Sequence, residues 1–183
     1  MARIVIVYGT GEGQTAKVAR HIGRALDAVG HTVELMDVAH ASDRIDWHAV
    51  DGVIVGASVH LGRHDRRVER FVARHRERLE ALPSAFFSVS MAAREITADD
   101  RVELDRHVAD FQARTGWHPA RMGEFAGALL YTRYNPFVRF VMRRIARDRG
   151  GDTDASRDHE YTDWDGVTRF AERFAASLET ASA

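Results

Sequence analysis

A glycine- and threonine-rich stretch near the N-terminus carries the clearest chemical signal in the sequence. It follows a short apolar run at residues 4–8 and reads Thr10-Gly11-Glu12-Gly13-Gln14-Thr15. Apolar side chains then recur at helical spacing, so the stretch joins a strand to the start of a helix. Such a junction points free backbone N–H groups and the positive end of a helix dipole at one spot. We therefore predict that residues 10–15 hold a phosphate.

The spacing within this stretch separates several phosphate ligands. A P-loop nucleotide site needs a lysine followed by serine or threonine at the end of the loop, where this chain has Gln14-Thr15. A Rossmann dinucleotide site needs its third glycine one residue later, although Asp37 after the next strand could still contact a ribose. A terminal phosphate monoester fits best, and the T-G-x-G-x-T pattern resembles that of FMN-binding flavodoxin-like domains. A dinucleotide site and a turn without a ligand are the alternatives.

Strands and helices alternate along the chain. We predict strands at 4–8, 32–38, 52–57, 84–90 and 123–130, and helices at 15–29, 66–82, 98–115 and 163–178. The first, third and fourth strands are apolar on consecutive residues, as in a parallel sheet covered on both faces, and the second alternates as an edge strand does. The rhythm predicts one α/β domain over residues 1–183: a flavodoxin-like, doubly wound, five-stranded parallel sheet in the order 2-1-3-4-5, with a long insertion before the last helix. Thr162 is the expected N-cap of that helix.

Two further segments should flank the ligand, because they end the third and fourth strands of that sheet. They read Ser58-Val59-His60-Leu61-Gly62 and Ser88-Val89-Ser90-Met91-Ala92-Ala93-Arg94. Both offer N–H and hydroxyl groups to the edge of a heterocycle, and neither contains a tryptophan or a tyrosine. The ring face would then be open to a second flat molecule. Arg94 has two interpretations, a cation that favours an anionic reduced flavin or a solvated loop residue.

Residues 131–158 form the insertion and contain a predicted basic amphipathic helix. Residues 133–149 hold six arginines against one aspartate, a local charge of +5. A helix of this kind can lie on an anionic membrane or hold an acidic substrate. Alternatively, its apolar face packs on the domain while its arginines pair with the acidic residues of 152–165.

Composition narrows the function further. The chain has 183 residues, 45% of them hydrophobic, and a net charge of −1, which gives no case for nucleic acid as a partner. The absence of cysteine excludes disulfides, iron–sulfur clusters and thiol catalysis. We predict no metal site, since His60 and His64 fall in a predicted loop without a nearby carboxylate pattern. With no visible signal peptide or long apolar run, the expected location is cytoplasmic.

Taken together, these segments resemble the menaquinone-dependent protoporphyrinogen oxidase family, flavodoxin-like proteins of haem biosynthesis. The resemblance lies in residues 10–15, 56–58 with Gly62 and His64, 82–89, 126–129 with Tyr131 and Arg133-Tyr134, and 150–154 with 161–164. It covers essentially the full chain. It implies FMN as cofactor and the six-electron oxidation of protoporphyrinogen IX to protoporphyrin IX. It also implies a membrane quinone as electron acceptor and peripheral contact with the inner face of the cell membrane.

The resemblance assigns roles to residues of this sequence. The cofactor-binding residues would be Thr10, Gly11, Glu12, Gly13, Gln14, Thr15, Ser58, Val59, His60, Leu61, Gly62, Ser88, Val89, Ser90, Met91, Ala92 and Arg94. The substrate propionates would meet Arg133, Arg139, Arg143 and Arg144, because guanidinium pairs well with carboxylate. The alternative hypothesis is a long-chain flavodoxin that carries electrons between protein partners through the basic helix.

Overall fold

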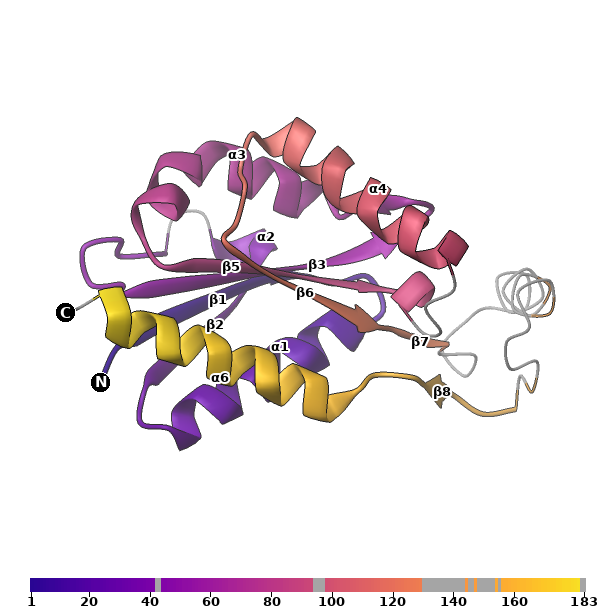
Figure 1. Cartoon of the computed structure of the whole chain (residues 1–183), viewed down its shortest axis with the longest axis horizontal. Helices are drawn as coiled ribbons and strands as arrows, with labels where there is room; N and C mark the ends of the chain where they lie inside the picture. The colour runs from indigo at the N-terminus through magenta and orange to yellow at the C-terminus, as the bar shows by residue number, and fades with distance from the viewer. Residues whose placement is uncertain are drawn as a thin grey trace.

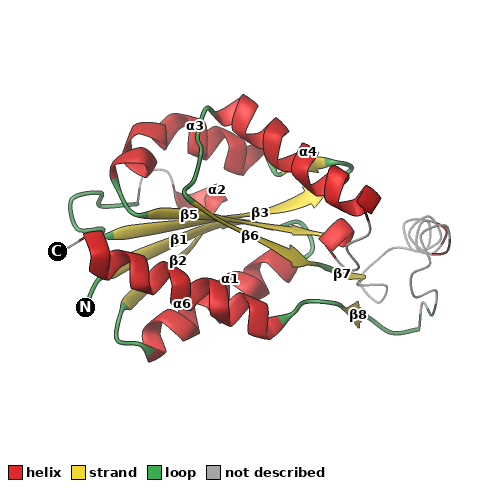
Figure 2. Ribbon diagram, viewed as in Figure 1, coloured by secondary structure: helices red, strands yellow, loops and turns green. Residues whose placement is uncertain are grey.

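A parallel sheet runs through the middle of the protein, with helices on both faces (Figures 1 and 2). The computed structural model describes residues 1–41, 44–93, 98–129, 144, 147, 154 and 156–181. The elements in chain order are β1 Arg3–Gly9, α1 Gln14–Ala28, β2 Thr32–Asp37, α2 Val38–Ala41, β3 Gly52–His60, β4 Arg63–His64, α3 Arg66–Ala81, β5 Ser84–Ser90, η1 Met91–Ala93, α4 Ala98–Thr115, β6 Arg121–Ala126, β7 Ala128–Leu129, β8 His159–Glu160 and α6 Trp164–Ala181.

The order of the sheet confirms the predicted topology. The strands lie as β2-β1-β3-β5-β6, all parallel, and the two-residue β4 pairs with the end of β3 in antiparallel fashion. With β4 set aside, this is the flavodoxin-like order 2-1-3-4-5. The register places Gly9 beside Ala57, Ala57 beside Ser88, and Ser90 beside Ala126. The carboxyl ends of four strands therefore meet at one edge of the sheet.

Two hydrophobic cores explain why the central strands are apolar on consecutive residues. Ile4 and Ile6 of β1 belong to a cluster with α1 and α6, whereas Val5 and Val7 belong to a cluster with α2, α3 and α4. Figure 1 shows the corresponding layers, α1 and α6 on one side of the sheet and α3 and α4 on the other. A strand covered on both faces has no position that faces solvent, so apolar residues can follow one another along it.

The third strand is longer than predicted. β3 continues through Ser58, Val59 and His60, then turns at Leu61-Gly62 and returns as β4. Both turn residues have positive φ, 50° and 72°, which is the backbone of a primed hairpin turn. The predicted loop after residue 57 is therefore a short β-hairpin. The sequence did not predict it, because the strand ends in polar residues.

The last predicted strand and the cap of the last helix also differ. β6 ends at Ala126, and the two residues after Gly127 pair with β8 in a separate small sheet. The N-cap of α6 is Asp163, whose carboxylate accepts from the Gly166 N–H at 3.0 Å. Thr162 does not cap the helix, because its hydroxyl donates to the Ala126 carbonyl at 2.7 Å.

Most of the insertion lies outside the described residues. Arg144 and Arg147 are described as helical and exposed, whereas Arg133, Arg139 and Arg143 are not described. Arg94 also lies outside the described residues, as does the side chain of Ala92. Among the helices that are described, none is long and apolar enough to cross a bilayer.

Candidate cofactor-binding site

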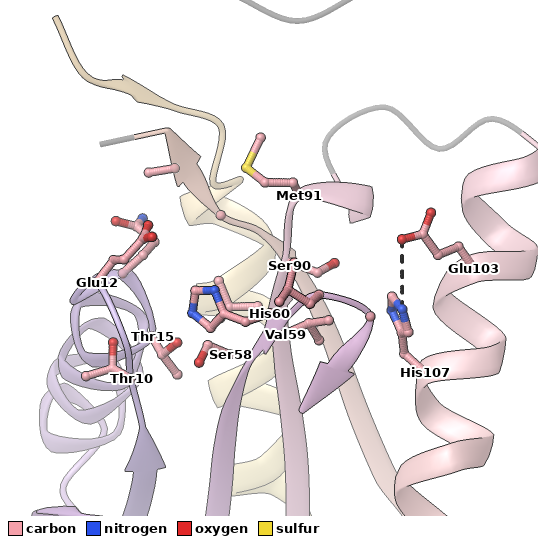
Figure 3. Close-up of a pocket in the computed structure, with 16 residues that line it drawn as sticks. Thr10, Glu12, Thr15, Ser58, Val59, His60, Ser90, Met91, Glu103 and His107 are labelled. Atoms are coloured by element: carbon pink, nitrogen blue, oxygen red, sulfur yellow. Dashed lines mark ion pairs between the residues drawn. The ribbon is translucent and has the colours of Figure 1, made fainter. Parts of the chain in front are cut away.

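A cavity of about 280 Å³ opens at the sheet edge where the carboxyl ends of the strands meet (Figure 3). It runs from the turn before α1, past the β3–β4 hairpin and the end of β5, to α4. Many predicted cofactor-binding residues line it: Thr10, Glu12, Gln14, Thr15, Ser58, Val59, His60, Leu61, Gly62, Val89, Ser90 and Met91. Segments far apart in the sequence thus form one site.

The turn before α1 has the geometry of an anion-binding helix N-terminus. Gly13 is the N-cap, with φ 101°, and no side chain caps the helix there. The Gly13 N–H donates to the Thr10 hydroxyl at 2.9 Å. The Lys17 N–H donates to the Gly13 carbonyl at 3.1 Å. The N–H groups of the first turn have no acceptor within the helix. They and the helix dipole favour a bound anion.

Three buried hydroxyls mark where a ligand would bind. Thr15 Oγ1, Ser58 Oγ and Ser90 Oγ are each buried without a hydrogen-bond partner in the described part of the chain. Leaving a buried polar atom unsatisfied costs about 1–3 kcal/mol, so native structures seldom do so unless a ligand or water completes the site. The described lining contains neither lysine nor arginine. The donor set therefore suits a phosphate monoester at one end and the polar edge of a ring further along.

The turn is held in place from α3. Arg67 donates to the Thr10 carbonyl at 3.1 Å and to the Asp65 carboxylate at 2.6 Å. Asp65 also accepts from the Arg67 N–H at 2.8 Å and so caps α3. Although burial opposes it, these hydrogen bonds and the Arg67 charge hold the pKa of Asp65 below its ordinary value. An ionised Asp65 therefore orients the guanidinium that supports the turn.

The side chain of Gln14 makes a structural contact in addition to lining the cavity. Its amide donates to Glu160 Oε1 at 2.8 Å and to Thr162 Oγ1 at 2.9 Å. Lys17 Nζ binds both oxygens of the same carboxylate, at 2.8 and 2.6 Å. The first turn of α1 is thereby tied to β8, the strand that follows the insertion.

Gly13→Ala should lower the free energy of unfolding by about 1–2 kcal/mol, because an L-residue with a side chain pays that amount in the left-handed region. Gly11→Ala is the matched control. A Cβ there would meet His60 Nε2 at 2.8 Å, the far end of an exposed side chain that can rotate away. Urea denaturation of both variants checks this, and an equal loss at the two positions would contradict it.

Some predicted residues lie elsewhere. Ser88 is buried and its hydroxyl is 2.9 Å from His64 Nε2, outside the cavity lining. Gly11 faces His60, and Gly13 lines a neighbouring groove over α1. Asp37, the residue considered for a ribose, accepts from the Ala39 N–H at 2.8 Å and does not line the cavity.

Sequence reasoning missed four lining residues: Glu103, His107, Gly127 and Ala128. Glu103 and His107 lie one turn apart on α4, and His107 is only 6% exposed. His107 could have been found from the sequence. It is a histidine on the inward face of the helix after the fourth strand, and that helix begins near the sheet edge where the ligand binds. Within the described residues, no group of three or more histidine, aspartate or glutamate side chains could hold a metal ion.

Comparisons with known proteins agree with this architecture. A family model described as a flavodoxin domain matches residues 5–156. Among solved structures, oxidised Flavodoxin 2 from Bacillus cereus superposes with a TM-score of 0.55 and 20% identity, covering 96% of this chain and 99% of that one. At this identity the likeness shows the fold.

Two relatives are similar over most of their length. Protoporphyrinogen IX dehydrogenase [quinone] of Escherichia coli (strain K12) is 33% identical over 174 residues, 94% of each chain. The protein of the same name from Leishmania major is 36% identical over 176 residues, 95% of this chain and 75% of the relative. The chain therefore belongs to the flavodoxin-domain family, among the relatives of the quinone-dependent protoporphyrinogen IX dehydrogenases.

Proposed function

We propose that this protein is an FMN-dependent dehydrogenase that oxidises protoporphyrinogen IX and passes the electrons to a quinone. The substrate and the acceptor follow from relatives that carry this name and align along nearly the whole chain. That alignment favours an enzyme over a flavodoxin that only carries electrons. One structural observation carries the cofactor assignment: buried, unpaired hydroxyls of Thr15, Ser58 and Ser90 line a cavity that begins at an uncapped helix N-terminus.

The cavity has residues that fit each end of FMN. The first-turn N–H groups of α1, with Thr10 and Thr15, would hold the phosphate. Ser58 and Ser90, with the backbone around them, would hold the polar edge of the ring. Bound there, the flavin supplies two-electron oxidation, so the protein needs no nucleophile of its own.

The described lining also leaves room for the substrate. It contains no phenylalanine, tyrosine or tryptophan that could cover a flavin face. The tip of the β3–β4 hairpin instead presents Leu61, whose side chain is fully exposed. A tetrapyrrole can therefore lie against the flavin where a purely electron-carrying domain would place an aromatic side chain.

The positive charge of the insertion gives it two proposed roles. We assign the substrate propionates to Arg133, Arg139, Arg143 and Arg144, and contact with the quinone-bearing membrane from the cytoplasm to the same basic segment. The +5 charge of residues 133–149 supports both roles. The tie between α1 and β8, the strand that follows the insertion, supports a role for this segment at the cofactor cavity. One flavodoxin-like domain over residues 1–183 completes the proposal.

Purified protein should contain one FMN per chain and form fluorescent protoporphyrin from protoporphyrinogen IX without oxygen, only when a quinone is added. Anaerobic fluorescence with and without menadione, a soluble quinone, measures this. A colourless protein that FMN cannot reconstitute would end the cofactor assignment. An FMN-loaded protein that protoporphyrinogen IX does not reduce would end the enzyme assignment and favour electron transfer between proteins.

A further inference from the structure

The end of the cavity opposite the phosphate turn is closed by two side chains of α4. In Figure 3, Thr10 and Thr15 lie on one side of the cavity, and His107 and Glu103 lie on the other. His107 Nε2 is 3.8 Å from Glu103 Oε1, within ion-pair range. This pair and the phosphate turn therefore lie at opposite ends of the cavity.

A glycine gives the cavity access to this histidine. A Cβ built on Gly62, at the tip of the hairpin, would come within 3.7 Å of His107 Nε2. Gly62 also has φ 72°, which disfavours any side chain there. The hairpin therefore passes His107 without a side chain to cover Nε2.

Glu103 is the carboxylate that faces His107, because the other nearby groups are neutral, paired elsewhere or not titratable. His64 of β4 lies edge-on to His107 at 6.4 Å between ring centroids, and burial above all lowers the pKa of His64 to about 4, so it is neutral. Glu69 of α3 is engaged by Arg63 and Arg114, at 2.5 and 3.4 Å. η1, which packs on the start of α4, contributes no titratable side chain.

The other titratable residues of the lining lie closer to the phosphate turn. They are Glu12, within the turn itself, and His60, whose Nε2 would be 2.8 Å from a Cβ on Gly11. Among the described lining residues, His107 and Glu103 are thus the titratable pair at the ring end of the cavity.

We propose that His107 is the proton acceptor for substrate oxidation and that Glu103 positions it, an inference that rests on the proposed function. Each two-electron step takes from the porphyrinogen one hydride equivalent, bound for the flavin, and one proton, from a pyrrole nitrogen or a bridging carbon. That proton goes to His107 Nε2, and the Glu103 carboxylate stabilises the resulting imidazolium. Reduction of the quinone to quinol consumes the hydride equivalent and the proton, which returns His107 to its neutral form. Three rounds account for six electrons and six hydrogens.

His107→Gln should slow anaerobic reduction of bound FMN by protoporphyrinogen IX by about 10²–10⁴-fold, the usual contribution of a general base. Reduction by dithionite should keep its wild-type rate, because dithionite delivers electrons without removing a proton from carbon or nitrogen. Quenching of FMN fluorescence, measured alongside, gives the fraction of each protein that holds FMN. The matched control is His118→Gln, an exposed histidine after α4. Substrate-driven reduction within threefold of wild type in the His107→Gln protein would overturn the proposal.

Rescue by imidazole separates a proton acceptor from a packing residue. Added imidazole should restore part of the substrate-driven rate in His107→Ala, and no restoration contradicts the assignment. Glu103→Gln should slow the same step less than His107→Gln.

A wild-type holoprotein that dithionite reduces but protoporphyrinogen IX does not would refute the proposed function itself, before any variant is compared.

Discussion

Thr15→Val is expected to weaken FMN binding by about 10- to 100-fold while leaving the protein without FMN as stable as wild type, or slightly more so. Thr15 is 1% exposed, and its hydroxyl has no hydrogen-bond partner in the described structure. Valine has the same shape, so the substitution removes an unsatisfied buried hydroxyl without opening a cavity. A hydrogen bond to a charged phosphate contributes about 1.5–3 kcal/mol, which sets the size of the affinity loss.

Quenching of FMN fluorescence measures the affinity, and urea denaturation without FMN measures the stability. Thr115→Val is the matched control, because Thr115 is also buried but its hydroxyl donates to the Phe111 carbonyl at 2.9 Å and accepts from the Trp117 N–H at 3.3 Å. The control should lose stability and keep its FMN affinity. Unchanged affinity in Thr15→Val, or a stability loss equal to that of the control, would show that Thr15 is an ordinary core residue.

Local pattern was sufficient where burial follows directly from the sequence. The predicted strand at 84–90 and helix at 98–115 coincide with β5 and α4, and the predicted strand order is the observed one. Consecutive apolar residues such as Ile4, Val5, Ile6 and Val7 have only one stable place, a strand covered on both faces. That constraint also brought residues 10–15, 58–62 and 89–91 to one edge of the sheet.

Tertiary contacts decided the features that the sequence did not reveal. Thr162 has the right chemistry for a helix cap, but the Ala126 carbonyl lies close enough to accept its hydroxyl hydrogen, and Asp163 caps the helix instead. The inward orientation of His107 depends on how α4 packs against α3 and β4. Neither outcome follows from a propensity or a spacing, because each depends on a partner that is distant in the chain.

Through His64, lowering the pH from 7 to 4 is expected to reduce the free energy of unfolding by about 3 kcal/mol. It is 2% exposed, sits edge-on to Phe86 and Phe111, and holds its Nε2 2.9 Å from the Ser88 hydroxyl. Burial is the main reason that its pKa falls from the ordinary 6.5 to about 4, with smaller contributions from His107 and Arg114 and opposition from Glu69. The unfolded chain therefore binds a proton below about pH 6.5, whereas the folded protein does so only near pH 4.

The sign follows from that difference. The unfolded state holds more protons between pH 6.5 and pH 4, so the free energy of unfolding falls as the pH is lowered through this window, by about 1.4 kcal/mol per unit. His64→Gln removes the titrating group, so its loss of stability between pH 7 and pH 4 should be smaller than that of wild type by about 3 kcal/mol, whatever constant offset the substitution adds at pH 7. Urea denaturation at half-unit steps of pH measures both curves, and His118→Gln, at an exposed position, should follow the wild-type curve. Parallel curves for His64→Gln and wild type would mean that the buried imidazole is charged in the folded protein, which its apolar surroundings and the unpaired proton it would then carry both disfavour.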